Sequence, residues 1–305
     1  MNQIQPTIAA LKLVDKKSYG NLTVFPLRRA APQEPGYLTL DQALAGDRIS
    51  IREMSEAGSV PQLLVENRFR QPVLLVDGEE LVGAKQNRIL NLTILIPAKK
   101  TIQIPVSCVE SGRWRYRSPE FSSSGDAQFC GGRAGKAASV SRSLRKTGQR
   151  QSDQGQVWRD IDMKMMAMEI GSPTAAMACM YSENRVGLQD YLDNLGADPD
   201  QAGAVFAIGD RIAGVDFFDS PAIFAKLYPK IVGSYAIDAM EIADKEAAAP
   251  HEREAQGFLN QIAETELERY PALGLGEDVR VSGTDLSGGG LVLDDQVIHF
   301  AAFVR

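Results

Sequence analysis

The sequence has few of the residues from which metal centres and disulfide frameworks are built. Its 305 residues include two histidines and three cysteines. Cys108, Cys130 and Cys179 are far apart and odd in number, without the paired spacing of zinc clusters or disulfide-rich domains. We therefore expect reduced thiols, which fit a cytoplasmic protein, and no histidine-rich metal site.

Long apolar runs and an excess of positive charge are also missing. No stretch approaches the roughly 20 apolar residues that cross a membrane, and no signal core follows the first residues. The net charge of −6 disfavours sequence-independent binding to nucleic acid, which depends on lysines and arginines facing phosphates. We expect no membrane partner and no sequence-specific nucleic-acid partner, and a homo-oligomer is compatible with the composition.

The order of strand-like and helix-like patterns predicts an α+β fold. The first 117 residues are mostly strand-like, and residues 101–110 alternate between apolar and polar side chains. Later, helical spacing is mixed with hairpins. We divide the chain into a β-rich half, residues 1–121, a basic flexible loop, residues 122–151, and an α+β half, residues 152–305, which could form one compact domain together. Predicted helices cover residues 154–169, 182–195, 220–240 and 252–269, and predicted hairpins turn at Gly209-Asp210 and Asp294-Asp295.

The basic loop is rich in glycine and serine, and no acid occurs between Cys130 and Gln151. Such a composition is typical of a mobile, solvated segment. It predicts either a linker between the two halves or a clamp that closes over a phosphate-bearing ligand.

A dense polar run, residues 77–88, lies between two strand-like apolar segments. It places acids, amides and an arginine in a short connection near a sheet edge. One interpretation is a charged turn with a solvated strand end. The other is a site for a polar ligand, built from Glu79, Glu80, Gln86, Asn87 and Arg88.

Several motifs together resemble one known family. They are Asp77-Gly78-Glu79-Glu80-Leu81, Gln86-Asn87-Arg88, Ile104-Pro105-Val106-Ser107-Cys108-Val109-Glu110-Ser111-Gly112-Arg113-Trp114, Gln154-Gly155-Gln156-Val157-Trp158, residues 205–236 and Ile298-His299-Phe300-Ala301-Ala302-Phe303. Over most of its length the chain resembles the ARG- and rhodanese-phosphatase-superfamily-associated protein domain family. By association with ADP-ribosylglycohydrolases, this resemblance implies a role in NAD or ADP-ribose metabolism, and it carries no catalytic assignment.

The polar residues have the chemistry that a nucleotide site needs. Arginines at 88 and 113 can meet phosphate oxygens with forked donors, and a tryptophan or tyrosine can stack on adenine. Trp114 has arginines on both sides, which makes burial less favourable for it than for Trp158 on the apolar side of a predicted helix. We predict Glu79, Glu80 and Glu110 as catalytic candidates, and Gln86, Asn87, Arg88, Arg113 and Trp114 as ligand-binding residues.

Established catalytic constellations are weak in this sequence. A Ser-His-Asp or Cys-His arrangement would have to use His299, which lies in an apolar strand. No cofactor is identified, but magnesium could be held by carboxylates with help from ligand phosphates. Its candidate ligands are Glu79, Glu80, Asp216 and Asp219. The alternative for Asp216 and Asp219, which we prefer, is a capping cluster at the N-terminus of the helix that follows.

Two functions from different classes follow. The first is binding, and in one version hydrolysis, of an NAD-derived or ADP-ribose-like nucleotide. The alternative is a non-catalytic protein-interaction or scaffold module.

Overall fold

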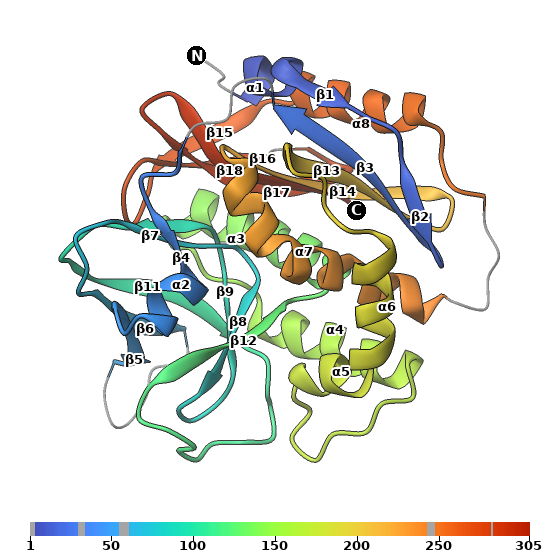
Figure 1. Ribbon diagram of the computed structural model, residues 1–305. Helices are drawn as coiled ribbons and strands as arrows, with labels where there is room; N and C mark the ends of the chain where they lie inside the picture. Colours follow the sequence, from blue (N-terminus) through green and yellow to red (C-terminus); the bar gives the residue numbers. More distant parts are fainter. Residues whose placement is uncertain (1–3, 30–33, 55–60, 243–247, 282) are drawn as a thin grey trace.

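The chain folds into the α+β structure of the computed structural model shown in Figure 1, which describes residues 4–29, 34–54, 61–242, 248–281 and 283–305. Its helices and strands are arranged around one large sheet and two smaller ones. Within the described ranges, no helix is long and apolar enough to cross a membrane.

The largest sheet has nine strands and joins the start of the chain to its end. Its order is β1-β3-β13-β14-β18-β17-β16-β15, with β2 paired to β3, and every pairing is antiparallel. Residues 11–29 thus share a sheet with residues 201–304, so the two halves expected from the sequence interleave. The strands are β1 (Leu11–Leu13), β2 (Lys17–Tyr19), β3 (Leu22–Arg29), β13 (Gln201–Ile208), β14 (Arg211–Phe218), β15 (Leu267–Pro271), β16 (Glu277–Val281), β17 (Leu286–Leu293) and β18 (Gln296–Val304).

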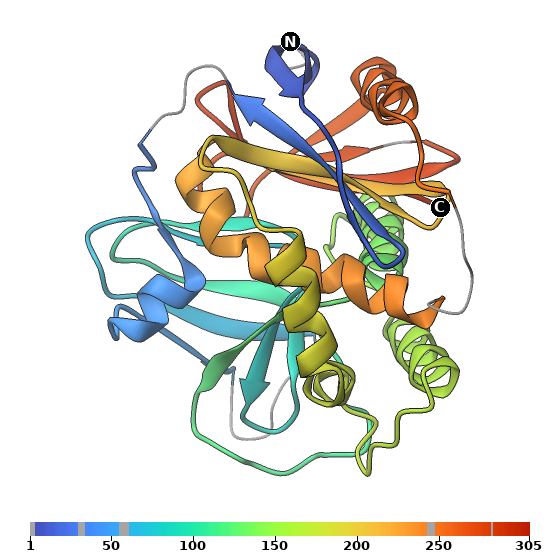
Figure 2. The same cartoon turned by 45° about the vertical axis from the view of Figure 1, so that its right-hand side comes forward.

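Helices cover both faces of this sheet (Figures 1 and 2). Helices α1 (Ile4–Ala10) and α8 (Glu252–Glu264) pack on one face, and α3 (Cys130–Thr147) and α7 (Pro221–Glu241) on the other. Each layer has its own apolar core. The central strands β3, β13 and β18 of the large sheet are therefore buried along most of their length, as their apolar residues require, whereas the edge strands β2 and β15 are partly exposed.

The smaller sheets lie on the far side of α7 from the large sheet (Figure 1). The six-stranded sheet has the order β12-β8-β9-β11-β6-β5, and the three-stranded sheet β10-β7-β4. Their strands are β4 (Leu38–Thr39), β5 (Ile49–Glu53), β6 (Gln62–Asn67), β7 (Val73–Leu75), β8 (Glu79–Gly83), β9 (Arg88–Leu90), β10 (Ile94–Ile96), β11 (Thr101–Cys108) and β12 (Phe121–Ala127). The remaining helices are α2 (Leu40–Ala45), α4 (Gln154–Ala167), α5 (Ala178–Glu183) and α6 (Arg185–Asn194).

Local signals in the sequence set several of these boundaries. The carboxylate of Asp153 accepts a hydrogen bond of 3.0 Å from the Gln156 N–H and caps α4. Helix α7 begins after Ser220 with Pro221 in its first turn. Asp294 and Asp295 have φ values of 47° and 63° at the predicted last hairpin turn.

Three expectations about local structure are wrong. Residues 122–151 do not form a flexible loop, because they contain the end of β12 and the whole of α3. The helix predicted over residues 182–195 does not begin at Ser182, because Ser182 lies inside α5 and α6 starts separately after Asn184. Helix α8 ends at Glu264, and the residues that follow enter strand β15.

Candidate functional site

Four of the predicted site residues meet around Asn87, in the connection from β8 to β9. The Asn87 side chain accepts a hydrogen bond of 3.1 Å from the guanidinium of Arg113 and donates one of 3.4 Å to the carboxyl of Glu80. Its backbone N–H donates to Glu110 at 3.1 Å, and Glu110 pairs with Arg113 at 2.6 Å. Burial opposes ionisation of Glu110, but Arg113 and the other donors lower its pKa below the ordinary value.

Glu80 differs from the other carboxyls of this cluster. Its side chain is completely buried, and burial raises the pKa of Glu80 to about 8. At neutral pH it therefore retains a proton and can donate a hydrogen bond, a property that active sites use for general acids.

Arg88 and Gln86 form a second cluster, which is internal to the small sheets. The Arg88 guanidinium is 0 % exposed, donates to Gln86 at 3.0 Å and to the Cys108 sulfur at 2.8 Å, and lies 3.6 Å from Glu53. Burial raises the pKa of the Cys108 thiol to about 11, as expected for a thiol on the inner face of a strand. A ligand could reach Arg88 only if this part of the fold opened.

Glu79 belongs to a third cluster, on the side facing α7. One carboxylate oxygen accepts from Lys230 at 2.7 Å, and the other accepts from the Val76 N–H at 2.7 Å. Lys230 also pairs with Asp41 at 2.7 Å. The charge of Glu79 is thus matched within the protein.

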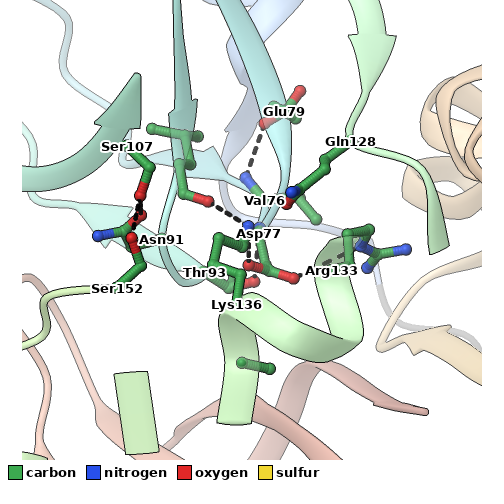
Figure 3. Close-up of polar contacts among 12 residues, drawn as sticks. Val76, Asp77, Glu79, Asn91, Thr93, Ser107, Gln128, Arg133, Lys136 and Ser152 are labelled. Carbon is green, nitrogen blue, oxygen red and sulfur yellow. Dashed lines mark hydrogen bonds and ion pairs between the residues drawn. The ribbon is translucent and has the colours of Figure 1, made fainter. Parts of the chain in front are cut away.

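A buried ionic network lies where α3 passes between the large sheet and the small sheets (Figure 3). Arg133 reaches Asp216 through two hydrogen bonds of 3.1 and 2.6 Å and lies 3.4 Å from Asp77. Lys136 pairs with Asp77 at 2.7 Å, and burial lowers the pKa of Lys136 to about 8. These pairs connect the polar run to strand β14, so they tie the two parts of the fold together.

His299 completes a chain that has the order of a catalytic triad. Its Nδ1 lies 2.7 Å from the Thr93 hydroxyl and its Nε2 lies 3.3 Å from Asp216. All three side chains are buried, the Thr93 hydroxyl already accepts from the Asp77 N–H at 3.1 Å, and Asp216 is paired with Arg133. Triad chemistry needs a hydroxyl that a substrate can approach, so this chain acts as a structural brace.

The four carboxylates considered for magnesium lie in separate networks. Glu79 pairs with Lys230, Glu80 bonds to Asn87, Asp216 pairs with Arg133, and Asp219 accepts a hydrogen bond of 2.5 Å from Tyr37. In the described parts of the chain, no group of three or more histidine, cysteine, aspartate or glutamate side chains is arranged to hold a metal ion.

The exposed part of this region is the loop of residues 112–118. Trp114 and Tyr116 are 49 % and 50 % exposed, and the Lys85 ammonium lies 5.2 Å from the centre of each ring. Arg113 fixes the loop to the β8–β9 connection by donating to the carbonyls of Gly83 and Ala84 at 3.2 and 2.8 Å. The loop therefore presents two aromatic rings and a cation directly beside the Asn87 cluster.

Lys85 was not predicted as part of this surface. The alternation Arg113-Trp114-Arg115-Tyr116-Arg117 indicates that the two rings share a side, because residues two apart in an extended segment point the same way, but it does not indicate Lys85, which reaches the rings only in the fold. Arg115 and Arg117 are exposed, and neither forms an ion pair within the described residues. Trp158, by contrast, is half-buried on α4.

The comparisons with known proteins identify one family. The model of the ARG and Rhodanese-Phosphatase-superfamily-associated Protein domain matches residues 10–303, nearly the whole chain. No curated protein and no solved structure matches the chain significantly. The chain therefore belongs to the ARG and Rhodanese-Phosphatase-superfamily-associated Protein domain family.

Proposed function

We propose that this family member binds an NAD-derived, ADP-ribose-like nucleotide at the loop of residues 112–118. The observation that carries the proposal is the pair of half-exposed rings, Trp114 and Tyr116, with Lys85 between them. Aromatic side chains on a fixed loop form a stacking platform for a base, and nearby cations match the phosphates.

The anchoring of the loop supports this function. The Arg113 guanidinium is held by the Glu110 carboxylate at 2.6 Å. It also donates to four further oxygens at 2.8 to 3.2 Å, namely the carbonyls of Gly83, Ala84 and Arg115 and the side chain of Asn87. Its role is therefore to position the loop, while Arg115 and Arg117 supply the exposed charge. A platform that is fixed before the ligand arrives loses less conformational entropy on binding.

The buried carboxylates support binding more than hydrolysis. Glu79 and Glu110 are neutralised by Lys230 and Arg113, and Glu80 is protonated at neutral pH, so none of them is a free base at the surface. The family name associates the domain with ARG proteins, which points to the same class of ligand. We therefore propose that the nucleotide is bound and released chemically unchanged.

Isothermal titration calorimetry with ADP-ribose and NAD tests the proposal. Loss of one stacked base contact costs about 1–3 kcal/mol, so Trp114→Ala should weaken binding by roughly 5- to 150-fold. Met166→Ala, which removes an exposed apolar side chain from α4, is the control and should bind as the wild type does. Chromatography of the ligand after long incubation with the protein and magnesium should recover it intact.

Exposed tryptophan, tyrosine and arginine are also the residues enriched in protein-binding hot spots, which keeps the interaction module as the second candidate. The same titrations distinguish this module from the nucleotide-binding protein. If neither ADP-ribose nor NAD binds at millimolar concentration, the nucleotide proposal fails and the interaction module becomes the preferred candidate.

A further inference from the structure

A second, independent cleft lies beside the last turns of α3. It has a volume of about 330 Å³ and is bounded by α3, by Gly283 and Thr284 before β17, and by Arg305 after β18. Three arginines, Arg142, Arg145 and Arg305, are among its lining residues, and no acidic residue is. This concentration of one charge in a concave site is the arrangement that attracts an anion.

Not every arginine of the cleft has its charge paired with a carboxylate of the protein. Arg145 pairs with Glu268 at 2.9 Å. Arg142 and Arg305 have no carboxylate side chain within ion-pair distance among the described residues, although Asp285 is bonded to the Thr284 hydroxyl nearby at 3.3 Å. The Arg142 guanidinium is thus left to meet a ligand with a forked pair of N–H donors, the geometry that suits a phosphate. The Arg305 guanidinium donates one long hydrogen bond of 3.5 Å to the Thr284 carbonyl and keeps further N–H donors for a ligand.

The helix dipole explains only part of this charge. Basic residues in the last turn of a helix interact favourably with its C-terminal end, which accounts for Arg145 and Lys146 in α3. Arg142 lies further from the C-cap at Gly148, and Arg305 follows a strand. The interaction with the helix dipole therefore does not explain why Arg142 and Arg305 meet in this cleft.

A larger cleft of about 600 Å³ continues from the first and shares Ala138, Arg142 and Arg305 with it. It runs between α3 and α4, which lie side by side in Figure 2. Along this cleft α3 carries Gly131, Gly135 and Ala138, whose small or absent side chains leave the space open. Its volume is in the range of pockets that enclose small molecules.

The polar groups of the larger cleft differ from those of the smaller one. Asp160 accepts a hydrogen bond of 2.6 Å from Gln156, and its carboxylate faces the α3 surface near Gly135. Lys164 pairs with Asp238 at 2.7 Å and also with Glu241, so its charge is matched. Carboxylate and amide groups without excess charge are suited to the hydroxyl groups of a polyol.

We propose that this double cleft binds a phosphate monoester of a hydroxyl-bearing small molecule, such as a sugar phosphate. The phosphate lies between Arg142 and Arg305, and the hydroxylated body extends over Gly135 toward Asp160 and Gln156. This site does not depend on the loop of residues 112–118.

Calorimetry with ribose 5-phosphate, inorganic phosphate and ribose, at physiological ionic strength, tests the site. Ribose 5-phosphate should bind saturably, inorganic phosphate at least tenfold more weakly, and ribose not measurably. Arg142→Gln should weaken ribose 5-phosphate at least tenfold. Arg52→Gln is the matched control, because it removes an exposed arginine that lines neither cleft and has no ion pair among the described residues, and it should leave this binding unchanged.

Asp160→Asn tests the hydroxyl end separately. It should weaken ribose 5-phosphate and leave inorganic phosphate unaffected. The proposal is overturned if ribose 5-phosphate shows no saturable binding at 20 mM, or if Arg142→Gln and Arg52→Gln lower affinity equally while circular dichroism shows both folded. Equal affinity for inorganic phosphate and ribose 5-phosphate would show that the sugar makes no favourable contact, and it would overturn the assignment of a sugar phosphate. Trp114→Ala should retain ribose 5-phosphate binding, so this site and the nucleotide site succeed or fail independently.

Discussion

Removal of the Asp216 carboxylate should be among the most destabilising single changes in the protein. Asp216 and Arg133 are both fully buried and joined by two hydrogen bonds of 3.1 and 2.6 Å, and Tyr235 donates a further bond of 2.9 Å to Asp216. Asp216→Ala leaves the Arg133 charge buried with only Asp77, at 3.4 Å, to balance it. Breaking a buried pair in this way costs about 3–5 kcal/mol, a large share of the roughly 5–15 kcal/mol that stabilises a domain.

Urea-induced unfolding followed by circular dichroism measures this loss. Asp210→Ala is the matched control, because the Asp210 side chain is 70 % exposed and lies 3.9 Å from the Arg211 guanidinium. The free energy of unfolding of this variant should stay within about 0.5 kcal/mol of the wild type. The double variant Arg133→Met with Asp216→Leu should be more stable than Asp216→Ala, because it removes both charges. A loss below about 1 kcal/mol for Asp216→Ala would refute the reasoning that this pair braces the fold.

Two further predictions concern pH dependence and helix capping. The folded pKa of Glu80, about 8, lies above its ordinary value of 4.5, so the folded state binds the extra proton and stability should fall as the pH rises from about 4.5 to about 8. Glu80→Gln should remove this dependence and unfold at higher urea than the wild type at pH 8.5; parallel pH profiles would contradict it. Asp153→Ala should cost about 1 kcal/mol in urea unfolding through loss of the α4 cap, and no change would show that the 3.0 Å bond to Gln156 is not needed.

The elements predicted well are those whose signals are local. Alternation identified the strand of residues 101–108, the Gly209-Asp210 turn identified the β13–β14 hairpin, and serine followed by proline identified the start of α7. Each depends on backbone preferences within a few residues, which a sequence shows directly.

Helix α3 was missed because its stability comes from distant partners. Gly131, Gly132 and Gly135 lower intrinsic helix propensity by up to about 1 kcal/mol each relative to alanine. Within the fold, Arg133 pairs with Asp216 in β14, and Lys136 pairs with Asp77 in the connection from β7 to β8. Such pairs join residues far apart in sequence, so composition alone predicts a loop.

The sequence predicted which residues of the candidate site lie together better than it predicted which of them are buried. Asn87, Glu110 and Arg113 do meet, as adjacent strand ends require. The burial of Arg88 and Glu79 could not be predicted, because charged side chains are buried only when paired, and their partners Glu53 and Lys230 come from other elements.

The most direct test of the nucleotide proposal uses the two tryptophans of the chain. The variant Trp158→Phe leaves Trp114 as the sole indole reporter, and its fluorescence can be titrated with ADP-ribose. Stacking of adenine on Trp114 predicts saturable quenching, and Tyr116→Ala in the same background should shift the midpoint to higher concentration. Fluorescence that stays constant up to millimolar ADP-ribose, with the variant folded, would contradict nucleotide binding at this loop.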